Sequence, residues 1–239
     1  MSQNGFTSRP RPLSYATADA GTVASFMNAV YAWMGVGLGV TALVAWVTSQ
    51  NEAMRQMVFQ PMTFIVLIIA ELALVWYVTS AINRLSVGTA TSLFVLYSAL
   101  NGLTLSVIFL RYQLGTVGAA FLITGGTFGI TSFVGFVTKK DLSGLGGLCF
   151  MALIGLILAS IVNIFVSNEM LFWIINYAGV LIFVGLTAYD TQKIKQFAYQ
   201  TQGDAVAAGR MSVLGSLILY LDFINLMIFM LRILGGKRR

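Results

Sequence analysis

The sequence predicts an all-α integral membrane protein, a bundle of seven transmembrane helices. Of its 239 residues, 58% are hydrophobic and only 9% are charged, whereas soluble domains carry about 25% charged residues. Several apolar runs reach the roughly 20 residues that a helix needs to cross a bilayer. The polar breaks between these runs are short, so neighbouring segments should run antiparallel, with no large soluble domain between them.

The first 22 residues predict a disordered cytoplasmic tail, and residues 23–239 predict one transmembrane domain. The tail is rich in Ser, Thr, Pro and Gly, a composition typical of disorder. Its arginines precede a polar stretch and not an apolar core, so it does not predict a cleavable signal peptide. The predicted spans are residues 26–48, 61–80, 87–110, 115–137, 147–166, 171–190 and 211–234.

Glycines in two of these spans indicate close helix packing. In the first span, Gly35 and Gly39 have the GxxxG spacing that lets two helix backbones approach in lipid. In the fourth span, Gly125, Gly126 and Gly129 predict a second close-packing face.

The basic residues predict a cytoplasmic N-terminus in the cell inner (plasma) membrane. With that orientation the inside loops hold most of the basic residues, as the positive-inside rule requires. We expect the last span to cross fully, although an incomplete crossing would return the basic C-terminus inside. The net charge of +6 is then explained by basic residues that set the topology and contact anionic lipid, and it does not indicate nucleic-acid binding. The inside set is Arg9, Arg11, Arg84, Lys139, Lys140, Lys193, Lys195 and Arg210, against Arg55 and Arg111 outside.

The composition excludes several kinds of site. The chain has no His, which excludes Ser-His-Asp triads, His zinc sites and haem held through His. Cys149 is the one cysteine, so an internal disulfide or a CxxC site cannot form. The last span has no interior Lys, which excludes a retinal Schiff base. We expect no cofactor, and Ca²⁺ only as a transported or bound ion.

Two aspartates in the last two spans are the main functional signal. Asp190 ends the sixth span, in Leu-Thr-Ala-Tyr-Asp-Thr-Gln-Lys, and Asp222 lies inside the seventh, in Leu-Tyr-Leu-Asp-Phe-Ile-Asn-Leu. A carboxylate at membrane depth is costly unless it faces the bundle interior. Two neighbouring carboxylates share a proton or attract a cation, and Ca²⁺ prefers oxygen ligands. We therefore predict a pH-sensing cation site at Asp190 and Asp222, with Ca²⁺ as its possible metal ion.

Other polar residues extend this prediction. Arg84 is the candidate latch that neutralises one carboxylate, and Glu71, Asn101 and Asn225 are candidate pore-lining residues. Small and polar side chains at helical spacing predict that the face bearing Asp222 packs on other helices. This stripe comprises Ser212, Gly215, Ser216, Leu219 and Asp222, and Asn225 continues it.

Simpler interpretations of these residues stay open. Asp190 near Lys193 would also suit a solvated helix end, and Asp222 would suit a polar contact that only fixes helix packing. Glu71 would also be explained by a purely structural role in the bundle, and Arg84 by a loop charge that only sets the topology.

The chain resembles the bacterial branch of the Bax inhibitor-1 family, also called the transmembrane Bax inhibitor motif family, over about residues 25–236. The resemblance lies in the two aspartate motifs, in Gly-Leu-Thr-Leu-Ser at residues 102–106 and in the late Leu-Arg-Ile-Leu-Gly. It implies a seven-helix bundle with the last helix central, and a pH-sensitive calcium leak gated by the aspartate pair. By position alone it implies Arg84 as latch and Glu71 as a pore carboxylate. The loop between the aspartates, residues 195–210, is long for this pattern.

Two other function classes remain. A regulatory membrane protein would bind a membrane protease or a stress or cell-death partner. An intramembrane aspartyl protease also places two aspartates on adjacent helices, one in a Tyr-Asp motif. The second aspartate of those proteases follows Gly-x-Gly, whereas Leu-Tyr-Leu precedes Asp222, and no Pro-Ala-Leu follows. We therefore predict that the chain is not an enzyme and that its partners are the lipid bilayer and calcium or protons, with a membrane protein as a further candidate partner.

Overall fold

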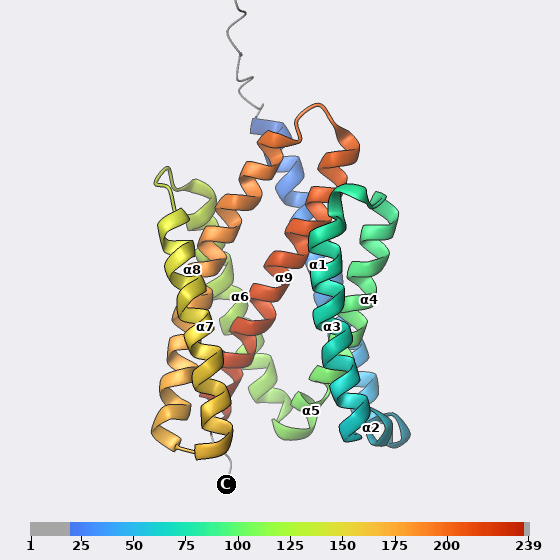
Figure 1. Ribbon diagram of the computed structural model, residues 1–239, viewed down its shortest axis with the longest axis vertical. Coiled ribbons are helices and arrows are strands. Elements are labelled where there is room, and N and C mark those ends of the chain that lie inside the picture. Colours follow the sequence, from blue (N-terminus) through green and yellow to red (C-terminus); the bar gives the residue numbers. More distant parts are fainter. Residues whose placement is uncertain (1–19, 237–239) are drawn as a thin grey trace, which may run out of the picture.

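The computed structural model describes residues 20–236, and within this range the regular structure is entirely helical (Figure 1). Most of the predicted tail lies outside the described residues, and its last three residues already belong to the first helix. The helices are α1 (Ala20–Gln50), α2 (Glu52–Val58), α3 (Pro61–Ala81), the 3₁₀ turn η1 (Ile82–Arg84), α4 (Val87–Leu105), α5 (Val107–Arg111), α6 (Leu114–Val137), α7 (Ser143–Val166), α8 (Glu169–Gln200) and α9 (Ala205–Gly235).

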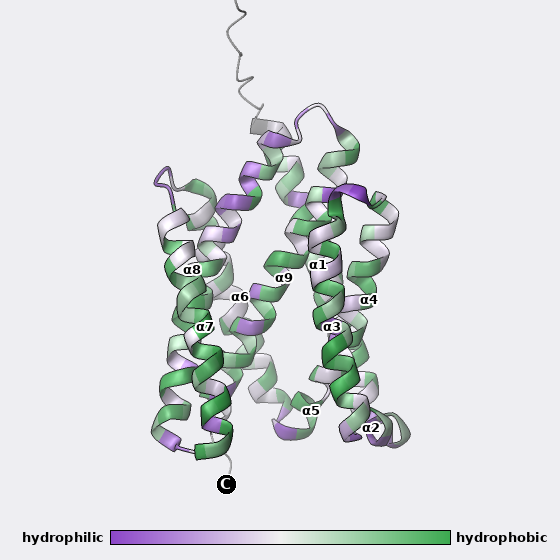
Figure 2. Ribbon diagram, viewed as in Figure 1, coloured by the Kyte–Doolittle hydropathy of each residue, from purple (hydrophilic) through white to green (hydrophobic). Residues whose placement is uncertain are grey.

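Seven helical stretches in the described chain are long and apolar enough to span a membrane, which confirms the predicted fold class. α3 and α7 expose most of their large apolar side chains, as helices that face lipid do. Figure 2 shows the hydrophobic residues along the lengths of the helices and the hydrophilic residues gathered mainly near the ends of the bundle.

The spans enter the bundle from alternating ends (Figure 1). The start of α1, the turn between α3 and α4, and the α6–α7 and α8–α9 loops lie at one end, called here the α8–α9 end. α2, α5, the α7–α8 turn and the last residues of α9 lie at the other, called here the α5 end. α9 therefore runs from one end of the bundle to the other, as the prediction of a full crossing requires.

The predicted long loop between the last two spans is wrong. α8 continues to Gln200 and α9 begins at Ala205, which leaves a connection of only four residues, 201–204. Gly203 turns the chain with a φ of 87°, which glycine adopts at little cost. The Asp204 carboxylate then accepts hydrogen bonds from the backbone N–H groups of Val206 and Ala207 and caps α9. The polar residues before and after this connection belong to the ends of α8 and α9. Polarity therefore did not show where the helices end and the loop begins.

Two short helices were also not predicted. The third predicted span breaks at Ser106, whose hydroxyl and backbone N–H both donate to the Leu103 carbonyl, so α4 ends and α5 begins. α2 starts where the Asn51 side chain accepts a hydrogen bond from the Met54 N–H. Both are local capping arrangements that hydropathy does not detect.

The prediction that these glycines pack closely against other helices of the bundle is wrong. A Cβ atom added at any of these glycines would meet no heavy atom within 4 Å, which means that they face open space. This set comprises Gly35, Gly39, Gly125, Gly126 and Gly129.

Other glycines make the close approaches. An added Cβ at Gly37 would lie 2.5 Å from the Phe94 ring, and one at Gly102 would lie 2.8 Å from the Thr41 carbonyl oxygen. An added Cβ at Gly135 would overlap backbone atoms of α8. These positions set how closely α1 approaches α4 and how closely α6 approaches α8.

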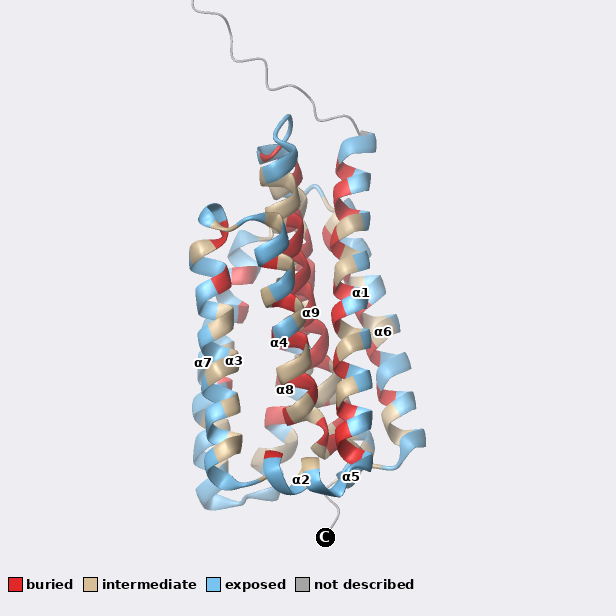
Figure 3. Cartoon of the chain, turned by 90° about the vertical axis from the view of Figure 1, so that its right-hand side faces the viewer, coloured by how far each residue is buried: buried red, intermediate tan, exposed pale blue. Residues whose placement is uncertain are grey.

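α9 is the helix with the most extensive buried surface. It packs mainly against α8, α1, α6 and α4, and Figure 3 shows buried residues along most of its length. The predicted stripe from Ser212 to Asp222 is buried at all five positions, and Asn225 beyond it is half-buried. The central position of this helix stays a prediction, because its main contacts involve four of the other six spans.

Candidate ion site between the last two helices

The aspartates lie on two antiparallel helices in a common register. The rings of Phe183 on α8 and Phe229 on α9 stack with their centroids 5.9 Å apart. Asp190 lies seven residues after Phe183, and Asp222 lies seven residues before Phe229. Seven residues are about two helical turns, so both aspartates return to the facing sides of their helices at the same level. The charge of Asp190 accordingly acts on Asp222.

Asp222 is the more enclosed of the two. It is 5% exposed, and its Oδ2 has no hydrogen-bond partner among the described residues. Asp190 is half-buried. A carboxylate oxygen that is buried without a partner is costly, so this oxygen is suited to a proton or a cation.

A chain of hydroxyl groups lies beside Asp190. Tyr31 on α1 and Ser132 on α6 share a hydrogen bond of 2.6 Å, and Ser132 and Thr191 on α8 share one of 2.9 Å. Thr191 directly follows Asp190 in the sequence motif. The chain thus joins three helices around the aspartates. Sequence reasoning missed it, although Thr191 stood in the motif.

The cation near the aspartates is Lys193. Its ammonium lies 5.9 Å from the centre of the Tyr189 ring, and its charge acts on both Asp190 and Asp222. Arg84 is exposed in η1, and its side chain forms neither a hydrogen bond nor an ion pair with any described residue. The structure does not bring Arg84 to the aspartates, and its latch role stays a prediction.

Glu71 and Asn101, two of the pore-lining candidates, meet in a separate polar network. The Thr104 hydroxyl donates to Glu71 Oε1 over 2.9 Å, and the Asn101 amide donates to Oε2 over 3.4 Å. The Tyr220 hydroxyl donates to Asn101 Oδ1 over 3.2 Å and shares a 2.6 Å hydrogen bond with the Thr41 hydroxyl. This Glu71 network joins α3, α4, α9 and α1.

The Glu71 network and the aspartate pair use different faces of α9. Tyr220 lies two residues before Asp222, and residues two apart on a helix do not face the same way. Asn225, the third pore-lining candidate, donates to the Leu221 carbonyl of its own helix over 2.8 Å. Asn225 is therefore not bonded to either group.

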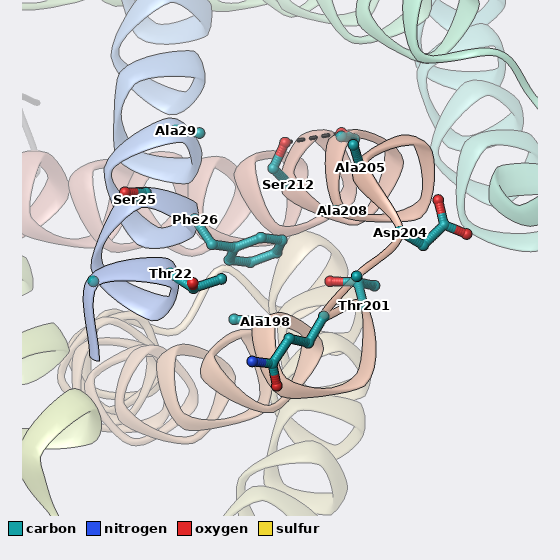
Figure 4. Close-up of a pocket in the computed structure, with 14 residues that line it drawn as sticks. Thr22, Ser25, Phe26, Ala29, Ala198, Thr201, Asp204, Ala205, Ala208 and Ser212 are labelled. Atoms are coloured by element: carbon teal, nitrogen blue, oxygen red, sulfur yellow. Dashed lines mark hydrogen bonds between the residues drawn. The ribbon is translucent and has the colours of Figure 1, made fainter. Parts of the chain in front are cut away.

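A cavity of about 660 Å³ lies at the α8–α9 end, between the first turns of α1, the last turn of α8 and the start of α9 (Figure 4). Phe26, Thr201 and Ser212 are among its lining residues. The Ser212 hydroxyl donates to the Gly209 carbonyl over 2.8 Å. Because Ser212 begins the stripe that leads to Asp222, this cavity opens onto the start of that face of α9.

Two carboxylates offer few ligands for a resident metal. Within the described residues, no group of three or more His, Cys, Asp or Glu side chains could hold a metal ion, and Ca²⁺ usually takes six to eight oxygens. An ion at Asp190 and Asp222 would need hydroxyl, carbonyl or water oxygens as well. The arrangement suits a passing cation better than a tightly held one.

Comparisons with known proteins cover almost the whole chain. The family model described as "Inhibitor of apoptosis-promoting Bax1" matches residues 23–239. The chain is 48% identical over 231 residues to the inner membrane protein YbhL of Escherichia coli strain K12, covering 96% of this chain and 98% of that protein. It is 44% identical to an uncharacterized protein of Deinococcus radiodurans, covering 90% and 92%. It is 40% identical to an uncharacterized membrane protein of Streptococcus pyogenes serotype M1, covering 92% and 96%.

Proposed function

Since the chain belongs to the Bax inhibitor-1 family of membrane proteins, we propose that it is a pH-sensitive leak pathway for cations, with Ca²⁺ as the transported ion. The observation that carries the proposal is the carboxylate of Asp222, which is buried, lacks a partner at Oδ2 and faces the helix that bears Asp190. Its proposed location is the inner membrane, with the N-terminus in the cytoplasm.

The pH sensitivity follows from competition at the aspartate pair. Two ionised carboxylates at close range repel each other in a low dielectric, so a proton or a cation is held between them. Protons and Ca²⁺ compete for the same oxygens, and a falling pH therefore weakens the binding of Ca²⁺. When neither a proton nor Ca²⁺ is bound, the positive charge of Lys193 partly balances the negative charge of the two aspartates.

The route begins at the α8–α9 end. The cavity between α1, α8 and α9 brings water near Ser212, and the buried stripe of Ser212, Gly215, Ser216 and Leu219 continues from there to Asp222. Ser212, Gly215 and Ser216 are small, so a slight separation of α9 from its neighbours would leave room for a partly hydrated ion.

The test is calcium flux from vesicles that contain the purified full-length chain and a calcium-sensitive dye. We expect flux above that of empty vesicles, and we expect it to vary with pH. Asp190→Asn and Asp222→Asn should lower the flux and remove its pH dependence, because an amide neither holds a shared proton nor balances a cation.

Glu169→Gln is the matched control, because Glu169 is an exposed carboxylate at the first residue of α8. It should leave both flux and pH response unchanged. If wild-type vesicles leak no more than empty ones at every pH, the chain is not a leak pathway. If both aspartate variants behave as wild type, the pair is not its gate.

A further inference from the structure

An apolar crevice of about 400 Å³ opens between α1, α6 and α9, close to the α5 end. Leu114 and Phe121 of α6 line it and are 57% and 46% exposed. Exposed apolar residues in membrane spans face hydrocarbon, so the crevice is open to the acyl chains of the bilayer. Its remaining walls are Leu38, Thr41, Ala42, Ala45, Leu105, Ile108, Phe109, Val117, Gly118, Phe223, Ile224 and Met227.

The crevice offers no free polar group. Thr41 is the one polar side chain among its walls, and its hydroxyl already bonds to the Ser98 carbonyl and to the Tyr220 hydroxyl. Buried water needs two or more polar partners. A hydrocarbon chain is therefore a better occupant of this space than water or an ion.

Two arginines lie at the end of this crevice. Arg111 ends α5 three residues after Ile108, and Arg232 lies on α9 five residues after Met227. Both wall residues belong to one apolar cluster with Leu231, the residue next to Arg232. The sequence neighbours of the arginines thus connect them to the crevice wall.

The ring of Tyr112, the residue after Arg111, lies against Gly235, three residues after Arg232. This contact brings the two arginines to the same end of the bundle, where the charge of Arg111 acts on Arg232. The Arg232 guanidinium lies 5.8 Å from the centre of the Phe229 ring. Neither arginine forms an ion pair with any described residue. Two neighbouring like charges without an acidic partner repel each other. An anion between them would relieve the repulsion.

We propose that the crevice and this arginine pair form a binding site for an anionic phospholipid of the surrounding bilayer. One acyl chain occupies the apolar crevice, and the phosphate lies between Arg111 and Arg232. Basic groups between transmembrane helices bind anionic head groups in this way. The site is separate from the aspartate pair and does not depend on ion transport.

The test measures lipid binding to the purified full-length chain by native mass spectrometry. Phosphatidylglycerol and phosphatidylcholine with identical acyl chains are compared, with inorganic phosphate as a third probe. We expect phosphatidylglycerol to bind about thirtyfold more tightly than phosphatidylcholine, from about 1 kcal/mol of attraction for each of the two arginines. Phosphate alone should not displace it.

Two sets of variants separate the head group from the acyl chain. The double variant Arg111→Gln with Arg232→Gln should remove the preference for phosphatidylglycerol, whereas Arg84→Gln at the opposite end should keep it. Gly118→Leu should weaken both lipids, because an added side chain at Gly118 meets no atom within 4 Å and extends into the crevice. Gly115→Leu on the same helix is equally unobstructed and lies outside the crevice, so it should change nothing.

Three results would overturn the proposal. They are equal binding of the two lipids to the wild type, equal losses in Gly118→Leu and Gly115→Leu, or full displacement of the lipid by phosphate.

Discussion

Lys193 is the residue that sets the charge balance of the aspartate pair. Its charge reaches both aspartates, and a positive charge favours the ionised form of a nearby carboxylate. We expect Lys193→Gln to move the pH at which calcium flux changes to higher values, because the pair then takes up protons more readily. The measurement is the vesicle flux assay across pH.

Lys195 provides the comparison for that experiment. Its ammonium donates to the Phe136 carbonyl over 2.8 Å and lies 4.9 Å from the centre of the Phe136 ring, so it serves helix packing. Lys195→Gln should leave the pH profile in place. An identical shift in both variants would show a general effect of surface charge and not a role for Lys193.

Asp141 gives a pH-dependent prediction outside the membrane. Its Oδ1 accepts a hydrogen bond from the Ser143 N–H, and this bond holds the pKa of Asp141 below its usual range. A carboxyl group whose pKa is lower in the folded than in the unfolded protein stabilises the fold at pH values above its unfolded-state pKa, which is about 3.9 for Asp. This stabilisation is lost as the pH falls through the pKa of the folded state. We expect protection of the Ser143 amide from hydrogen exchange to fall in acid, relative to its intrinsic rate.

The Leu142 amide is the internal control for Asp141, because it donates to the uncharged Gln192 side chain over 2.9 Å. Asp141→Asn should remove the pH dependence at Ser143 and leave Leu142 unaffected. Equal loss of protection at both amides would instead indicate that the whole α6–α7 loop opens.

At the scale of the elements, one glycine on α6 sets the distance to α8. A Cβ at Gly135 would overlap the backbone of Ala188, which cannot rotate away as a side chain can. We expect Gly135→Ala to destabilise the bundle by about 1–3 kcal/mol, as overpacking does in a filled interior. Thermal unfolding in detergent measures this change.

Gly126→Ala on the same helix is the matched control. Gly126 faces open space, and alanine favours a helix by up to about 1 kcal/mol over glycine. This variant should be neutral or slightly more stable than the wild type. If both alanine variants melt like the wild type, the close approach at Gly135 does not limit the packing of α6 on α8.

These elements show what the sequence can and cannot reveal. The seven spans follow from hydropathy, because length and apolarity are local properties. The close-packing glycines do not, because spacing shows which residues share a face but not which face meets another helix. Gly35 and Gly39 fit a packing motif and meet no atom, whereas Gly37 between them lies against Phe94.

The candidate site shows the same limit. Asp190 and Asp222 stood out because a carboxylate in an apolar run is rare, and the structure places both on facing helices. The hydroxyl groups of Tyr31 and Ser132 come from helices far apart in sequence, so no local pattern joins them to the pair. Lys193 entered the sequence analysis as a topology charge and as the neighbour of Asp190 at a solvated helix end, and not as a partner of Asp222, because its reach to Asp222 depends on how α8 and α9 pack.

At the scale of the whole molecule, the basic residues divide between the two ends of the bundle. Arg84, Lys139, Lys140 and Arg210 lie in or beside the connections at the α8–α9 end, while Arg55 belongs to α2 at the other. The positive-inside rule then predicts that the α8–α9 end faces the cytoplasm. In that orientation the cavity beside Ser212 opens to the cytoplasm, and the arginine pair of Arg111 and Arg232 contacts the outer leaflet.

Single cysteines tested with a membrane-impermeant maleimide on intact cells decide this orientation. Cys149 is only 7% exposed and is first replaced by alanine, which gives a background without thiols. Gln202→Cys at the α8–α9 end and Gln56→Cys on α2 both replace exposed residues, so both thiols are accessible to the reagent from their own side. We expect labelling of Gln56→Cys in intact cells, and of Gln202→Cys only after the membrane is permeabilised. The opposite labelling pattern would show that the chain has the inverted orientation in the membrane. Calcium would then reach the cavity from outside the cell, and the arginine pair would contact lipids of the cytoplasmic leaflet.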